Sequence, residues 1–121
     1  FGEEKPTKKK IMSMMTDSTP VEDPKDPSNS IIIDLFSLVA SDQQLQEMKD
    51  DFLKGGTGYG DFKKRLFEAF WEYFEPMRTK RKELSEDPQY IENILKEGAV
   101  RAREAASATL KRARHSCGIT S

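Results

Sequence analysis

The stretch DFKKRLFEAFWEYFEPMRTKRKELSED, residues 61–87, decides the fold that we expect for this chain. Its apolar residues recur every three or four positions, which is the spacing of one face of an α-helix. Phe67 and Trp71 widen that face, so we predict that this helix is the central and best-buried element. Asp61 is a good N-cap for it, and Pro76 predicts a kink or one broken hydrogen bond inside it.

Helix signals also dominate the residues before this stretch. Residues 5–15 predict a short helix, and residues 16–30, with three prolines, predict a connecting loop. The run at 31–40 favours a helix, although its β-branched isoleucines would also suit a strand. Residues 42–54 then predict a helix that is capped by Asp42.

The last predicted helix has Asp87 as its N-cap and Pro88 as its first residue, and it ends at Gly118. Small residues, Gly98 among them, follow one side of this helix and would permit the close approach of another helix. No segment alternates between polar and apolar residues as a strand does. We therefore predict an all-α fold, a compact bundle of about five helices with a proline-rich N-terminal connecting loop.

The composition bounds the class of protein. The chain has 121 residues, enough for one modest domain, and 34% of them are charged. The net charge of -1 does not by itself demand a nucleic-acid partner. The single cysteine excludes a disulfide within the chain, and no apolar run approaches the roughly 20 residues of a membrane span. Without an initiator methionine or a signal peptide, we expect a part of a longer chain.

The glycine-rich stretch GGTGYGDFKK, residues 55–64, raises the question of a phosphate-binding loop. It lacks the Lys-Ser/Thr pair of a P-loop, and its glycines do not have the dinucleotide-binding spacing. We interpret Gly58 and Gly60 as structural residues of a tight turn that leads to the Asp61 cap, with Tyr59 packed over the junction. The alternative is that exposed amides at the helix start contact an anion.

The sequence predicts neither a metal site nor a catalytic site. His115 and Cys117 stand two residues apart near a helix end, and a zinc site needs about four ligands, or three and a water. No nucleophile motif and no histidine paired with an acid are present. We expect no metal, no cofactor and no catalytic residue in this segment.

Basic residues gather late in the chain. Residues 28–60 carry two Lys/Arg and five Asp/Glu, whereas residues 88–121 carry six and three. A basic patch attracts phosphate backbones without reading their sequence. The alternative is a helix surface on which these charges pair with Glu75, Glu83 and Glu104. The candidate nucleic-acid contacts are Arg78, Lys80, Arg81, Lys82, Arg101, Arg103, Lys111, Arg112 and Arg114.

Three stretches in order resemble one family. They are KKKIMSMMTDSTPVEDPKDP, LKGGTGYGDFKKRLFEAFWEYFEPMR and ILKEGAVRAREAASATLKRARHSCGI. Thr-Asp-Ser after a basic helix, Gly-Tyr-Gly before a helix with an internal proline, and a closing Glu-Gly-Ala helix resemble the C-terminal part of bacterial-type tryptophanyl-tRNA synthetases. The resemblance covers residues 5–119.

The resemblance implies a class I aminoacyl-tRNA synthetase, which joins tryptophan to its tRNA through an adenylate made from ATP with Mg. It implies tryptophan tRNA, the catalytic domain of the same chain and a homodimer as partners, in the cytoplasm or an organelle. Both class I signatures are absent here, and the string KIMSMM at 10–15 is not the Lys-Met-Ser-Lys-Ser signature. We therefore expect this segment alone to be inactive.

The resemblance also assigns parts of the chain. Residues 1–30 would be a helix and linker that follow the catalytic domain, and residues 31–121 would be a helical domain on the anticodon side. Gly98 would be a structural residue, and Asp17 would cap a local turn or contact the signature loop. Trp71 is expected to be structural from its place on the apolar face of its own helix. The alternative function is a non-catalytic helical module for protein interaction.

Overall fold

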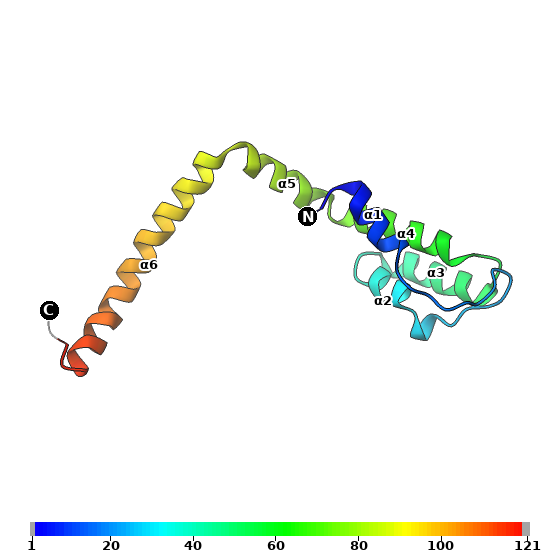
Figure 1. Ribbon diagram of the computed structural model, residues 1–121, viewed down its shortest axis with the longest axis horizontal. Coiled ribbons are helices and arrows are strands. Elements are labelled where there is room, and N and C mark those ends of the chain that lie inside the picture. The colour runs from blue at the N-terminus through cyan, green and yellow to red at the C-terminus, as the bar shows by residue number, and fades with distance from the viewer. Residues whose placement is uncertain (1, 120–121) are drawn as a thin grey trace. The chain divides into compact units, whose positions relative to one another are not determined.

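The fold is all-α. The computed structural model describes residues 2–119, and within them it contains six α-helices, one short 3-10 helix and no strand (Figure 1). The chain divides between Arg78 and Thr79 into two compact units. The division at residue 30 that the sequence suggested concerns the arrangement of a longer protein, and it stays a prediction.

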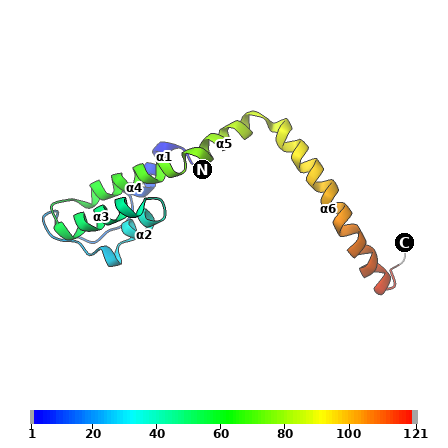
Figure 2. The ribbon, with the colours of Figure 1, turned by 180° about the vertical axis from the view of Figure 1, so that it is seen from behind.

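The first unit is built around α4 (Tyr59–Tyr73). Two helices, α1 (Glu4–Met12) and α2 (Ile31–Ser37), both pack against α4, and α2 also packs against α3 (Asp42–Lys54). Figures 1 and 2 show α3 and α4 side by side. The central position predicted for this helix is confirmed. The buried core consists of Ile32, Ile33, Phe36, Met48, Phe52, Phe62 and Leu66.

The kink or broken hydrogen bond predicted at Pro76 is present as a boundary between two helices. α4 ends at Tyr73 and a separate helix, α5 (Glu75–Glu86), follows. Proline has no N–H for the carbonyl four residues earlier, and its ring clashes with that carbonyl. Phe74 forms the joint, because its N–H bonds to the Phe70 carbonyl at 3.2 Å and its own carbonyl accepts from the Arg78 N–H at 3.0 Å. This break accounts for the additional helix.

Two predicted N-caps were wrong. Ser41, not Asp42, caps α3, because the Ser41 hydroxyl accepts from the Gln44 N–H at 3.3 Å while the Gln44 side chain accepts from the Ser41 N–H at 2.9 Å. In α4 the N-cap residue is Gly58, three residues before Asp61. The Asp61 carboxylate instead accepts from Lys64 Nζ, three residues later, at 2.8 Å.

The loop between α1 and α2 is fixed to the end of α3. It includes the 3-10 helix η1 (Pro27–Asn29). The backbone of this loop is hydrogen-bonded to the residues that follow α3. The Gly56 N–H donates to the Val21 carbonyl at 2.8 Å. Gly55 has a φ of 73°, and a Cβ there would collide with the Glu22 carbonyl oxygen. Glycine is therefore required at position 55 by both backbone conformation and space.

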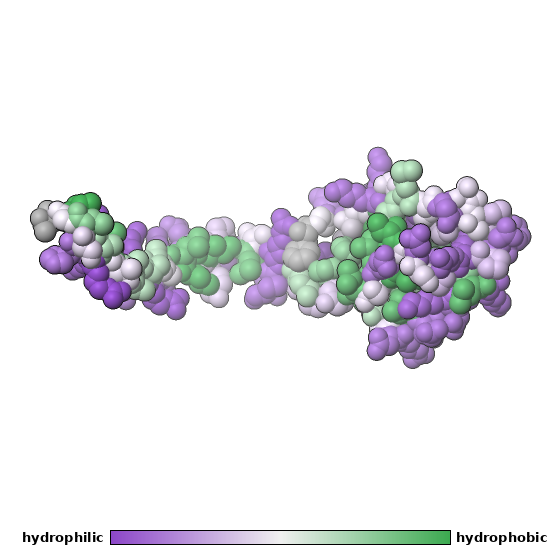
Figure 3. Space-filling model, turned by 90° about the horizontal axis from the view of Figure 1, so that it is seen from below, coloured by the Kyte–Doolittle hydropathy of each residue, from purple (hydrophilic) through white to green (hydrophobic). Residues whose placement is uncertain are grey.

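The second unit contains the end of α5 and the helix α6 (Pro88–Ser116). Asp87 caps α6 by accepting from the Tyr90 N–H at 3.0 Å, and Pro88 is its first residue, as predicted. No residue between 79 and 119 is buried. Figure 3 shows hydrophobic side chains on the surface of this unit, where Ile91, Ile94 and Leu95 are exposed. A Cβ added at Gly98 would meet no atom within 4 Å.

Candidate nucleic-acid interface

The basic residues singled out in the sequence lie on two helices. Arg78 belongs to the first unit, and the others follow it on α5 and α6 in the second unit. All those in the second unit are exposed: Lys80, Arg81, Lys82, Arg101, Arg103, Lys111, Arg112 and Arg114.

One of the predicted charge pairs is present. Lys80 Nζ lies 3.0 Å from a Glu83 carboxylate oxygen, and this hydrogen bond raises the pKa of Lys80. Both side chains are more than half exposed, so solvent screens their attraction and the pair contributes little to stability. A pair of this kind does not exclude a phosphate contact, because a weakly held lysine can exchange partners.

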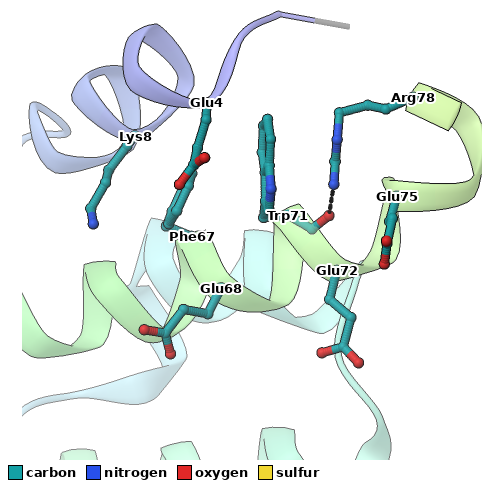
Figure 4. A pocket seen from close by; sticks show the side chains of 8 residues that line it. All are labelled: Glu4, Lys8, Phe67, Glu68, Trp71, Glu72, Glu75 and Arg78. Atoms are coloured by element: carbon teal, nitrogen blue, oxygen red, sulfur yellow. Dashed lines mark hydrogen bonds between the residues drawn. The ribbon is translucent and has the colours of Figure 1, made fainter. Parts of the chain in front are cut away.

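Arg78 is held differently from the other basic residues, because it stacks on an aromatic ring. Its guanidinium carbon lies 3.6 Å from the centre of the Trp71 ring, and Nη2 donates to the Trp71 carbonyl at 2.5 Å (Figure 4). On α4, the Trp71 ring also stacks with Phe67 at 5.7 Å, and Lys8 Nζ lies 5.3 Å from the centre of the Phe67 ring. We call these four side chains the cation–aromatic stack.

A pocket of about 480 Å³ opens beside the cation–aromatic stack. Four glutamates and two basic residues supply much of its wall. Figure 4 shows these side chains coming from α1, from α4 and from the start of α5. The residues that line the pocket are Glu4, Lys8, Phe67, Glu68, Trp71, Glu72, Glu75 and Arg78.

Sequence reasoning missed the lysines of α1. Lys5, Lys8 and Lys9 are exposed, and their spacing of three and four residues places them on one side of the helix. Because α1 packs on α4, these lysines belong to the same unit as the pocket. The signal was the run of three lysines at residues 8–10, which was used only to predict a helix.

Asp17 makes the contacts that a local structural role requires. One carboxylate oxygen accepts from the Thr19 N–H at 2.9 Å, and the other accepts from the Tyr59 hydroxyl at 2.8 Å. The bonds from Thr19, followed by the one from Tyr59, lower the pKa of Asp17. Burial raises the pKa of Tyr59, and its bond to Asp17 raises it further. The loop and the glycine-rich turn are thereby joined, with the Tyr59 ring packed edge-on against Phe52 at 6.1 Å.

No group of His, Cys, Asp and Glu residues within residues 2–119 is arranged to hold a metal ion. Cys117 is exposed at the end of α6, and His115 lies in the last turn of that helix. Over the same described part of the chain, no helix is both long enough and apolar enough to cross a membrane.

Comparisons with known proteins agree on one group of enzymes, although no family model matches the chain. A tryptophan–tRNA ligase of Rhodopirellula baltica is 45% identical over 119 residues, which are 98% of this chain and 37% of the relative. The ligase of Fusobacterium nucleatum is 39% identical and is covered to 36%. The chain thus spans little more than a third of the length of these curated relatives.

Solved structures give the same answer. The crystal structure of tryptophanyl-tRNA synthetase from Campylobacter jejuni matches with a TM-score of 0.91 and 39% identity, over 98% of this chain and 38% of that one. A second structure of that enzyme, complexed with ADP and tryptophan, matches with a TM-score of 0.90. As the three sequence stretches predicted, the chain is similar over nearly its whole length to the C-terminal helical region of bacterial tryptophan–tRNA ligases.

Proposed function

We propose that this chain is the C-terminal helical part of a tryptophan–tRNA ligase, and that it helps to hold the anticodon arm of tryptophan tRNA. The observation that carries the proposal is the 45% identity to such a ligase over 98% of the chain. The rest of the enzyme would supply the catalytic domain, where tryptophan is attached to the tRNA at the expense of ATP bound with Mg. The intact enzyme would be a cytoplasmic homodimer.

The contribution of this segment would be binding, without chemistry. Its charged side chains suit an RNA arm, because lysines and arginines hold the phosphates while aromatic and guanidinium planes stack on exposed bases. The exposed lysines of α1 and the basic residues of α5 and α6 supply the first kind of contact. The half-buried guanidinium plane of Arg78 is the candidate for the second. Purified residues 1–121 are expected not to exchange pyrophosphate into ATP.

Charge reversal in the full-length enzyme tests this proposal. Changing Arg81→Glu and Lys82→Glu together should weaken tRNA binding and flatten its dependence on salt, because phosphate contacts release counterions. Formation of tryptophanyl-adenylate, measured as pyrophosphate exchange, should stay near normal, because that step does not use tRNA.

The matched control reverses two lysines on the acidic helix α3, Lys49→Glu and Lys54→Glu, which should leave tRNA binding nearly unchanged. If the Arg81 and Lys82 variant keeps its affinity and its salt slope while remaining folded, these residues do not contact the tRNA. The same result with α6 reversed at Arg101 and Arg103 would remove the proposed role of the second unit.

A further inference from the structure

We infer that the contact of Arg78 with Trp71 is a clamp on the joint between α4 and α5, and that Arg78 is a positioning residue for the basic side chains that follow it. The inference rests on the proposed function, because positioning matters only if the tRNA contacts α5. It goes further by giving Arg78 a task in the free protein, separate from any base that its guanidinium plane meets.

The joint is a weak point in the backbone. Phe74 alone separates α4 from α5. Pro76 has no N–H, so one backbone hydrogen bond is lost in the first turn of α5. The bonds that cross the joint include that of the Phe74 N–H to the Phe70 carbonyl and that of the Arg78 N–H to the Phe74 carbonyl. Breaks at proline are places where helical segments bend.

A side-chain contact spans the same joint. Arg78 and Trp71 are seven residues apart, which is about two turns of a helix. The Arg78 guanidinium carbon lies 3.6 Å from the centre of the Trp71 ring, a close cation–π contact. Nη2 of the same guanidinium donates to the Trp71 carbonyl at 2.5 Å (Figure 4). One side chain of α5 thus holds both the ring and the backbone of the last turn of α4.

The end of a helix suits this contact. Trp71 lies in the last turn of α4, where the carbonyls lack a partner within the helix and carry partial negative charge. A guanidinium bound there satisfies an acceptor, and it places a positive charge at the end of the helix dipole that favours one. The clamp therefore stabilises the end of α4 and the start of α5 together.

The same contact leaves little of the guanidinium for a phosphate. Nη2 is bonded to the Trp71 carbonyl, and Nη1 is buried without a hydrogen-bond partner among the described residues. An arginine that holds a phosphate commonly uses two N–H groups side by side. Four glutamates and two basic residues line the pocket at this point, and the excess of negative charge repels a phosphate. Arg78 therefore suits a role inside the joint better than a phosphate contact.

The clamp would act on tRNA binding through the rest of α5. This helix runs without interruption from Glu75 to Glu86, so bending at the joint would move its later side chains, Lys80, Arg81 and Lys82 among them. Holding these side chains in place before the tRNA arrives lowers the ordering cost of binding. Loss of the clamp should thus weaken binding, and the number of phosphate contacts, which sets the dependence on salt, should stay the same.

Hydrogen exchange in the intact enzyme without tRNA tests the clamp. Trp71→Leu removes the ring and leaves Arg78, whereas Arg78→Lys keeps the charge and loses the planar fork. Each change should speed amide exchange in peptides that span residues 74–80 by roughly 2- to 30-fold, the range expected for one cation–π contact. The double variant should match the single variants, because all three lack the same contact. Trp71→Tyr keeps an aromatic face and should restore slow exchange.

The matched control is Arg65→Lys, because Arg65 also lies on α4 but donates to Asp51 of α3 at 2.6 Å. This change should leave exchange at residues 74–80 unchanged. Unchanged exchange there in Trp71→Leu and Arg78→Lys, in enzymes that remain folded, would show that the contact is not a clamp. Faster exchange throughout α4 would overturn the inference too, because it would make Trp71 a general core residue.

Binding of tryptophan tRNA at several salt concentrations tests the positioning role. Trp71→Leu should weaken binding roughly 2- to 30-fold with an unchanged salt slope, and Trp71→Tyr should restore it. Faster exchange at the joint together with unaltered tRNA affinity would overturn the positioning role. Failure of the proposed function is seen separately, as unaltered tRNA binding after charge reversal at Arg81 and Lys82, because the exchange measurement uses no tRNA.

Discussion

The two units differ in burial: the first has a buried core, and the second has none among its described residues. In the first unit, residues of α2, α3 and α4 form a buried core, and Ile11 of α1 packs against it. In the second unit no residue between 79 and 119 is buried, and charged groups cover much of α6. Stability in this chain therefore depends on the first unit. The second unit keeps its side chains available for contacts outside the segment.

The largest effect should come from the core of the first unit. Phe52 is 0% exposed and its ring lies 4.1 Å from the ring of Phe62, so Phe52→Ala should cost about 3–5 kcal/mol. Leu95 on α6 is 66% exposed, and Leu95→Ala should change stability by less than about 0.5 kcal/mol. Urea unfolding of the purified chain measures both values. Equal losses for the two variants would show that the second unit also has a core.

Replacing one glycine in each unit should change the stability of the chain by smaller amounts and in opposite directions. Gly55→Ala should destabilise the chain by about 1–3 kcal/mol, because φ is positive and the Glu22 carbonyl occupies the space. Gly98→Ala should instead stabilise α6 by about 0.5–1 kcal/mol, because alanine is the better helix former and the space is open.

Gly98→Ala, measured in the intact enzyme as well as in the segment, distinguishes a Gly98 that packs against another part of the enzyme from one that has no packing role. If Gly98→Ala destabilises the intact protein but stabilises the isolated segment, another part of the enzyme lies against this glycine. That outcome would support the close helix approach that the small residues of α6 predict. Stabilisation in both would leave Gly98 without a packing role.

The elements predictable from the sequence were those with strong local signals. The break at Pro76, the Asp87 cap and the helix end at Gly118 follow from the chemistry of single residues, and the structure contains all three. The caps of α3 and α4 were placed wrongly because several serines, aspartates and glycines compete near each helix start. At α3, Ser41 is the cap because Gln44 completes the capping box with it. At α4, the first helical residue, Tyr59, packs its ring against Phe52.

The pocket was beyond sequence reasoning. Trp71 and Arg78 were both noticed, but as a core residue and a phosphate contact. The two residues are seven positions apart, and their stacking spans the joint at Phe74. Lys8 and Glu4 join the pocket only because α1 packs on α4. Phe70 lies on α4 but is only half-buried, since its side of the helix borders an apolar groove.

Cross-linking tests the central claim most directly. Tryptophan tRNA is cross-linked to the intact enzyme with ultraviolet light, and the linked peptides and nucleotides are identified by mass spectrometry. The account predicts that anticodon-arm nucleotides link to peptides of α1, α5 and α6. Cross-links from the anticodon arm that lie only outside this segment, in an enzyme that still aminoacylates its tRNA, would contradict it.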